Sequence, residues 1–260
     1  MLSITLRFAN SDLRDELLIL HTVLRAIRAV AFESSQAEPA LALLGWWHSE
    51  LLESSTTTSQ HPAIRAMKDC GVLARIDLAD LAVFIQSVSE LSRGEPIENQ
   101  DDLINLALRI GGAAAGMEQA LGGGRPLEFT RQSGVADFLC WCLQNFDRTL
   151  AGECWWLPLD AQAKFGVHVG SFQDQGVQSQ RVRAIGLQAG ESLNRIRQLT
   201  MESPAGDSSS GVCRHLHICA AVNVHRLARL AKNPARYWPL RNSPWDTVVA
   251  WRAAREHQRL

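Results

Sequence analysis

The stretch from Phe138 to Gly166, FLCWCLQNFDRTLAGECWWLPLDAQAKFG, decides how we interpret the fold of this chain. We expect a long helix over Gln132–Leu150, then a short connection that ends at Leu157-Pro158, then a small helix that ends at the glycine. The long helix carries two amides, Gln144 and Asn145. A neutral amide offers a carbonyl dipole and an N–H donor, but it has no net charge with which to hold a hard dication. These two positions therefore cannot supply the carboxylates that a magnesium site needs.

Outward from this stretch, the chain is a series of helix patterns separated by short breaks. In Asp12–Glu33, apolar residues recur at steps of three and four, which is one helical stripe. Ile76–Leu91 has the same pattern, and Gly122-Gly123-Gly124 ends a longer helix expected over Gln100–Leu121. Further helices are expected over Pro39–Glu53, from Pro62 onward, and over Ser179–Met201, Val212–Leu230 and Trp245–His257. No stretch alternates with period two, so we predict an all-α fold, a helical bundle that forms a single domain over residues 1–260.

The composition is that of a soluble globular protein. Hydrophobic residues make up 46% and charged residues 20% of the 260 residues, and a chain of this length can bury a sizeable core. No apolar run approaches the roughly 18 residues that a membrane span needs, and no secretory signal is evident. Six cysteines without regular spacing indicate reduced thiols, so we expect a cytoplasmic protein. The net charge of −1 argues against a general nucleic-acid binder.

The C-terminal segment 226–260 is basic although the whole chain is not. It has eight Lys or Arg residues against Asp246 and Glu256, with tryptophans interleaved. Basic residues mixed with tryptophan suit an anionic membrane surface or an acidic partner, so peripheral contact with an anionic membrane is one prediction. The alternative is a solvated helix end whose tryptophans turn into the core.

The strongest candidate for a metal-binding motif is the cluster Cys213, His215, His217 and Cys219. All four side chains are of types that bind zinc, and they lie within seven residues. On a helix, however, Cys213 pairs with His217 and His215 pairs with Cys219. The four side chains then lie on two faces rather than at one site. We therefore expect no metal at this cluster.

The long helix and the connection after it resemble the active-site helix of the squalene/phytoene synthase family, where the pattern N-x-x-R-D-x-x-x-D precedes a leucine-proline pair. Counting back from Leu157-Pro158 places the Asn position on Trp141 and the Arg position on Gln144. The two Asp positions fall on Asn145 and Thr149. In the family, magnesium held by carboxylates neutralises a departing diphosphate. The resemblance implies that the charges for this chemistry are absent here.

A second family motif, D-D-x-x-D, lies one short loop before a tryptophan pair, and Trp46-Trp47 resembles that pair. Counting back from these tryptophans places the three Asp positions on Arg28, Ala29 and Phe32. None of the three has a carboxylate, and one is a cation. Only Glu33, beside the motif, keeps an acid. Both motifs have therefore lost their carboxylates together.

The resemblance extends over most of the chain. Phe8–Arg14 resembles the family's opening F-x-x-x-x-x-R, and Leu157–Val167 is similar to the branch that contains a mitochondrial complex I assembly factor. That branch also lacks intact aspartate motifs, and Trp245–Trp251 resembles its closing helix. The resemblance implies the isoprenoid synthase fold and a function without catalysis. That function would be binding of an isoprenoid-like lipid or of a protein partner, as in the assembly of a respiratory or membrane enzyme.

The resemblance also implies a central cleft between the two motif helices. Arg28, Gln144 and Asn145 would form its mouth, where Arg28 would supply the cation that magnesium supplies in active relatives. At most one residue of the tryptophan pair would face the cleft, since neighbours on a helix point in different directions. The residues expected there are Arg28, Phe32, Glu33, Trp46, Trp47, Leu139, Trp141, Gln144, Asn145 and Asp147. Alternatively Phe32 and Trp141, both larger than the residues they replace, plug the cavity.

Two other functions stay open at this point. One is an active prenyl transferase that uses displaced carboxylates such as Glu33 and Asp147, although Asp147 lies roughly on the opposite side of the helix from the first Asp position. Only this alternative would need magnesium, and otherwise no cofactor is expected. The other is a structural interaction module whose cleft is filled by its own side chains. Loss of both motifs argues against an active prenyl transferase. Whether the cleft is open or filled decides between a binding protein and a structural module.

Overall fold

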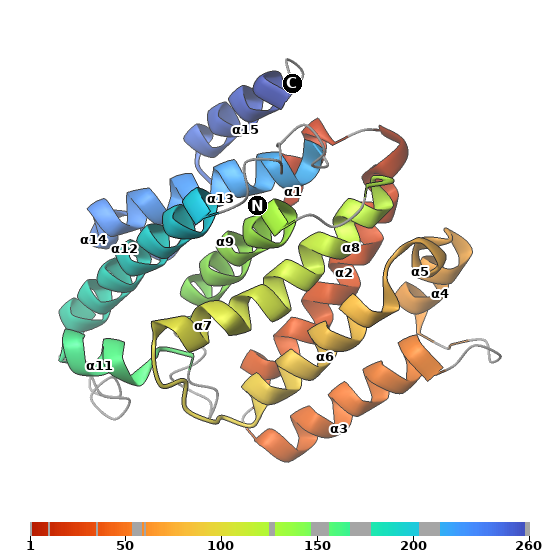
Figure 1. Cartoon of the computed structure of the whole chain (residues 1–260), viewed down its shortest axis with the longest axis horizontal. Coiled ribbons are helices and arrows are strands. Elements are labelled where there is room, and N and C mark those ends of the chain that lie inside the picture. The colour runs from red at the N-terminus through yellow and green to blue at the C-terminus, as the bar shows by residue number, and fades with distance from the viewer. Residues whose placement is uncertain are drawn as a thin grey trace.

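Helices in adjacent layers make up the computed structural model of this chain (Figure 1). It describes residues 2–9, 11–34, 36–53, 59, 61–124, 128–146, 156–166, 178–202 and 214–257. The elements are α1 (Leu2–Thr5), η1 (Leu6–Phe8), α2 (Ser11–Glu33), α3 (Ala37–His48), η2 (Ser49–Glu53), α4 (Pro62–Asp69), α5 (Val72–Arg75), α6 (Leu78–Ser92), α7 (Gln100–Ala107), η3 (Leu108–Gly112), α8 (Ala113–Leu121), α9 (Glu128–Gln144), α11 (Leu159–Phe165), α12 (Gln178–Glu202), α13 (Arg214–Lys232), α14 (Pro234–Tyr237) and α15 (Pro244–His257). No strand occurs in these described ranges, so the predicted all-α fold is confirmed. None of the described helices is long and apolar enough to cross a bilayer.

The inner helices of the bundle are α2, α8 and α9. In Figure 1, α9 lies between α12 and α13 on one side and α8 on the other, and it packs against all three. α6 packs on α8 and α2, and α3 covers α6 at the outside of the molecule. At the opposite side, α15 packs on α13. The two helices that carry the predicted motifs, α2 and α9, are therefore both central elements.

The apolar stripe predicted in Asp12–Glu33 fixes the rotation of α2. Leu17, Leu20, Leu24 and Ile27 are all at most 1% exposed and belong to the main hydrophobic cluster. Burial of each such side chain stabilises the fold by about 1.5–3 kcal/mol. Because this face is held in the core, the residues one position further along the helix point to a neighbouring face.

The helix predicted over Gln100–Leu121 is continuous, but its hydrogen bonding changes in the middle. η3, a π-helical turn that contains Gly111, joins α7 to α8. At this turn the backbone of Gly111 packs on the backbone of Gly134 in α9. A β-carbon on Gly111 would lie only 2.1 Å from the Gly134 carbonyl oxygen. Only two glycines allow the helices to approach this closely.

The ends of the motif helix and of the small helix after it differ in how well they were predicted. α9 begins at Glu128, earlier than the predicted Gln132, and its predicted end at Leu150 lies outside the described residues. α11 ends at Phe165 and Gly166 caps it, so the glycine marks the end of this helix as predicted. This glycine has a left-handed conformation with φ of 65°, which favours glycine at the end of a helix.

Candidate functional site

A cleft of about 570 Å³ opens beside α2, α9 and α13. Its volume lies in the range of about 300–1,000 Å³ that is usual for small-molecule sites. The lining residues are His21, Arg25, Arg28, Ala29, Phe32 and Glu33 from α2, Asp137, Cys140, Trp141, Gln144 and Asn145 from α9 and its end, Asn223 and Arg226 from α13, and Leu240, Arg241 and Asn242 from the segment before α15.

Helical spacing explains why these residues share the cleft. The lining positions of α2 between His21 and Glu33 follow one another at steps of one to four residues along a single face. Those of α9, between Asp137 and Asn145, do the same. The cleft is therefore formed by two helix faces, with α13 and residues 240–242 beside them.

Six of the residues that the sequence predicts at the cleft line it, namely Arg28, Phe32, Glu33, Trp141, Gln144 and Asn145. Arg28 and Gln144, from the two degenerate motifs, thus share one cleft. The two amides do not bond to Arg28, however. Gln144 donates to the Leu240 carbonyl at 3.3 Å, and Asn145 donates to the Trp141 carbonyl at 2.8 Å. Their role in binding a ligand stays a prediction.

Three predicted residues lie elsewhere. Trp46 and Trp47 are on α3, which packs on α6 and α2. Their rings contact each other, with centroids 5.0 Å apart, and both contact the ring of His61. Leu139 is 1% exposed in the hydrophobic core. The structure therefore does not place these three residues at the cleft, because their helix positions face other neighbours. Asp147 lies outside the described residues.

Arg28 has a partner that the sequence analysis missed. Its Nη1 donates to Asp137 Oδ2 at 2.9 Å, and Asn223 donates to the other carboxylate oxygen at 3.3 Å. The guanidinium also lies 5.3 Å from the centroid of the Trp141 ring. Burial alone would raise the pKa of Asp137, but the Arg28 charge beside it holds that pKa below its ordinary value. Asp137 is therefore ionised and fixes the orientation of Arg28.

Phe32 and Trp141 form an apolar wall of the cleft. Their rings meet edge to face with centroids 4.3 Å apart. The volume of about 570 Å³ remains with both side chains in place. The two aromatic residues therefore narrow the cavity without plugging it.

The charge of the cleft is predominantly positive. The two carboxylates that line it are Glu33 and Asp137, against the basic side chains His21, Arg25, Arg28, Arg226 and Arg241. Arg226 is already engaged, because its Nε and Nη2 donate to the buried Asp246 at 3.1 and 2.9 Å. Arg25 and Arg241 are exposed, and neither forms an ion pair with another described residue.

The described residues of the cleft do not fit magnesium. Magnesium prefers an octahedral set of oxygen ligands, usually built on carboxylates. In the described part of the chain, one group of three or more acidic, histidine or cysteine side chains lies close enough to share an ion, and it is His21, Glu118 and His215. Glu33 and Asp137 belong to no such group, and Asp137 is neutralised by Arg28.

Part of what sequence reasoning missed was visible in the spacing. His21 and Arg25 precede Arg28 by two turns and one turn of the same helix, and Asp137 precedes Trp141 by one turn. Extending each motif backwards along its face would have found them. Asn223 and Arg226 reach the cleft only through the packing of α13 on α9, for which the sequence carries no local signal.

A crystal structure of a dehydrosqualene synthase in complex with a ligand has the same fold, with a TM-score of 0.68 and 13% identity over 99% of this chain and 91% of that chain. At this identity the likeness shows the fold alone, and it confirms the predicted isoprenoid synthase bundle. No curated protein shows significant similarity in sequence. The sequence model of squalene/phytoene synthases matches residues 2–253, and the chain therefore belongs to the squalene/phytoene synthase family.

Proposed function

We propose that this protein is a member of the family without prenyl-transfer activity, and that its cleft binds an isoprenoid-like lipid with an anionic headgroup. One observation carries the proposal. On the facing sides of α2 and α9, Arg28 and the amides of Gln144 and Asn145 occupy an open cleft at the motif positions. A cation at such a position attracts a phosphate but repels a metal ion.

The headgroup would bind at the basic side of the cleft. The Arg28 side chain is mostly buried, and its Nε has no hydrogen-bond partner among the described residues. Arg25 and Arg241 add exposed guanidinium groups that are free to engage a ligand. A guanidinium matches the geometry of phosphate oxygens and needs no bridging metal. The site therefore suits a phosphate or diphosphate ester.

The apolar part of the ligand would lie against the aromatic wall. Phe32, Trp141 and Leu240 offer apolar surface next to the basic side chains. Burial of a prenyl chain there would contribute about 25 cal/mol per Å² of apolar area removed from water. Head and chain together select an amphiphilic ester over either inorganic phosphate or an uncharged alcohol.

The experiment is a binding titration with an activity control. Farnesyl diphosphate should quench the tryptophan fluorescence of the protein in EDTA, whereas farnesol and inorganic pyrophosphate should bind at least about tenfold more weakly, since each loses one of the two contributions. Arg28→Gln should weaken binding, and Arg65→Gln, on the exposed face of α4, should not. No pyrophosphate should be released from prenyl diphosphates with magnesium.

An active prenyl transferase with displaced carboxylates is the alternative. Glu33 does line the cleft, as this alternative requires. Magnesium-dependent release of pyrophosphate, or formation of a squalene-type or phytoene-type product, would establish it and end the non-catalytic proposal.

The outer face of α15 is a candidate for a second contact surface. Trp245 is 64% exposed and Trp251 is 48% exposed, and the Arg255 guanidinium lies 4.8 Å from the centroid of the Trp251 ring. Exposed tryptophans beside arginines are typical of helices that rest on anionic membranes. We propose peripheral membrane contact through this face. A role as an assembly factor for a membrane enzyme would be compatible with such contact, and it stays a prediction from the resemblance.

A further inference from the structure

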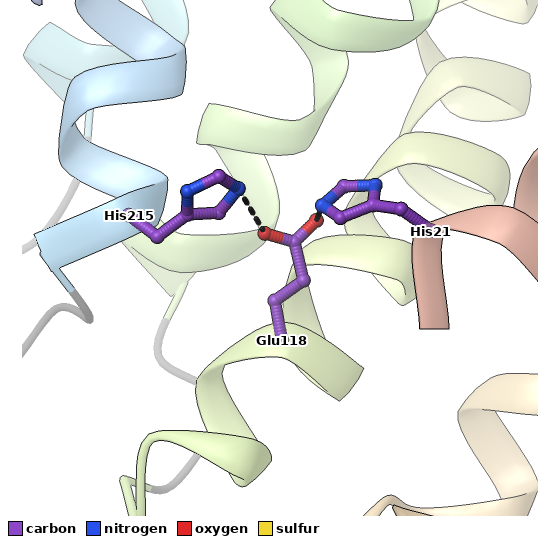
Figure 2. A group of neighbouring side chains, drawn as sticks. All are labelled: His21, Glu118 and His215. Carbon is purple, nitrogen blue, oxygen red and sulfur yellow. Dashed lines mark ion pairs between the residues drawn. The ribbon is translucent and has the colours of Figure 1, made fainter. Parts of the chain in front are cut away.

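Three side chains from three separate helices converge in the interior next to the cleft. Figure 2 shows His21 of α2 and His215 of α13 on either side of the Glu118 carboxylate of α8. His21 Nε2 lies 3.2 Å from Glu118 Oε1, and His215 Nε2 lies 3.6 Å from Glu118 Oε2. The ligand atoms of all three side chains lie within 4.8 Å of one another.

Burying this carboxylate between two imidazoles destabilises the fold unless an opposite charge or a metal ion compensates the loss of hydration. His215 is 1% exposed and Glu118 is 5% exposed, so a carboxylate is held away from water between two imidazole rings. His21 Nε2 and Glu118 Oε2 are both buried; Nε2 has only the ion-pair contact with Glu118 Oε1, without good hydrogen-bond alignment, and Oε2 accepts no hydrogen bond from another described residue. Nearly all buried polar atoms in proteins have a hydrogen-bond partner, so these two atoms need a specific explanation.

The two nitrogen-to-oxygen separations are close to those between the ligands of one metal ion. Ligand atoms at about 2.0–2.1 Å from a tetrahedral zinc ion are about 3.3–3.4 Å apart. The nitrogen-to-oxygen separations of 3.2 and 3.6 Å, one to each carboxylate oxygen, bracket that value, and all the ligand atoms lie within 4.8 Å of one another. Two imidazoles and one carboxylate are also a known protein ligand set for zinc sites that keep one position open.

We propose that His21, Glu118 and His215 form a binding site for one divalent transition-metal ion of the zinc class. The set contains two nitrogen ligands, which suit zinc, cobalt and similar ions and do not suit magnesium or calcium. The site is thus separate from the magnesium chemistry of the lost aspartate motifs. It does not depend on the proposed lipid binding.

The surroundings of the three residues support the assignment. His215 is buried on α13 with its ring facing the Glu118 carboxylate. The Cys219 thiol, one helical turn further along α13, lies 3.3 Å from His215 Nε2 and places a soft donor beside the site. His21 lines the cleft, which gives an ion a path inward. The open position would be taken by water.

The competing explanation is a metal-free ion pair. Burial alone would lower the pKa of His21, but Glu118 raises it above the ordinary value. A protonated His21 beside an ionised Glu118, with neutral His215, would then satisfy the charges without a metal. The two explanations differ in whether the purified protein binds one equivalent of a metal ion.

The test uses the full chain without a histidine tag, dialysed against EDTA. Zn²⁺ and Co²⁺ are titrated calorimetrically at neutral pH, and the bound metal is counted by elemental analysis after gel filtration. We expect one ion per chain, visible d–d bands for tetrahedral Co²⁺, and no binding of Mg²⁺. Glu118→Gln and His215→Gln should each weaken binding by roughly 100-fold or more, because even the outer-shell partners of metal ligands contribute 10–100-fold. His217→Gln, on the same helix, is the matched control.

Each outcome bears on the proposal. Absence of stoichiometric Zn²⁺ or Co²⁺ binding by the folded wild-type chain overturns it. Unchanged affinity in both variants also overturns it, because the ion then lies elsewhere. If a variant does not fold by circular dichroism, X-ray absorption of the wild-type cobalt complex decides instead, since a shell of two imidazoles and an oxygen is required. Lipid binding in EDTA is measured separately, so failure of the metal site leaves the proposed function untouched.

Discussion

Arg28 of α2 and Asp137 of α9 form an ion pair across the two helices of the cleft, with Nη1 2.9 Å from Oδ2. By the motif correspondence that the resemblance implies, the cation occupies a position where the family has a metal-binding aspartate, and its partner lies one turn before the position of the family's asparagine. Under the proposed function, this pair of opposite protein charges takes the place of the bridge that magnesium makes between two acidic helices in active relatives.

Breaking this ion pair should destabilise the protein. Arg28→Gln should lower the free energy of unfolding by about 2–3 kcal/mol, somewhat below the cost for a fully buried pair, because the Asp137 side chain is 27% exposed. The measurement is chemical denaturation. In the background of Asp137→Asn, the same change should cost much less, and additive effects of the two substitutions would show that the pair contributes nothing.

The same pair predicts how stability depends on acid pH. The folded pKa of Asp137 lies below the ordinary value of 3.8, so its contribution is present above that value and is lost as the pH falls through the folded pKa. Arg28 and His21 favour its charge, whereas Glu118 opposes it. Asp137→Asn should therefore lose less stability than the wild type when the pH is lowered below about 4. Parallel pH profiles of the two proteins would contradict this assignment.

The contact between η3 and α9 leaves no room for a side chain at Gly111 or Gly134. A β-carbon on Gly134 would lie 1.9 Å from the Gly111 carbonyl oxygen, so both backbones would have to move apart. We expect Gly134→Ala to lower the melting temperature strongly, with a cost at or above the upper end of about 1–3 kcal/mol for overpacking. Gly45→Ala is the control, because a β-carbon on Gly45 would meet nothing within 4 Å. It should stabilise α3 by about 0.5–1 kcal/mol. Equal effects of the two changes would rule out the close contact.

The face of α15 should bind vesicles in proportion to their charge. Sedimentation with liposomes should increase with the fraction of anionic lipid and decrease with salt. The double change Trp245→Ala and Trp251→Ala should weaken it. Trp46→Ala, which removes a tryptophan with 39% exposure on α3, should not. If sedimentation depends on neither the lipid charge nor the ionic strength, the proposed membrane contact through α15 is wrong.

Local patterns in the sequence predicted most of the helices. For the site, they predicted which residues share one face of a helix, but not which helices meet there. The stripe of Leu17, Leu20 and Leu24 predicted α2 because helical burial has a fixed period. The resemblance placed Arg28 and Gln144 at one cleft, where both are found. Three features escaped prediction because they arise from contacts between distant segments.

The first of these is the π-turn at η3, which reflects the packing of Gly111 on another helix and leaves no periodic signal. The second is the position of Trp46, which the resemblance placed near the cleft and which packs instead on His61. The third is the meeting of Glu118 with two histidines from other helices. The sequence predicted that His215 and Cys219 share a face of α13, which the 3.3 Å contact confirms, but it gave no indication of what that face meets.

The most direct test of the central claim is the affinity for farnesyl diphosphate measured in EDTA and again with excess Mg²⁺. Under the proposed function, arginines take the role of the metal and bind the diphosphate by themselves, so we predict equal affinity in the two conditions, within about twofold, and loss of binding in Arg28→Gln. Binding that appears only with Mg²⁺ and survives the loss of Arg28 would contradict the account, because the metal would then hold the headgroup as it does in active prenyl synthases.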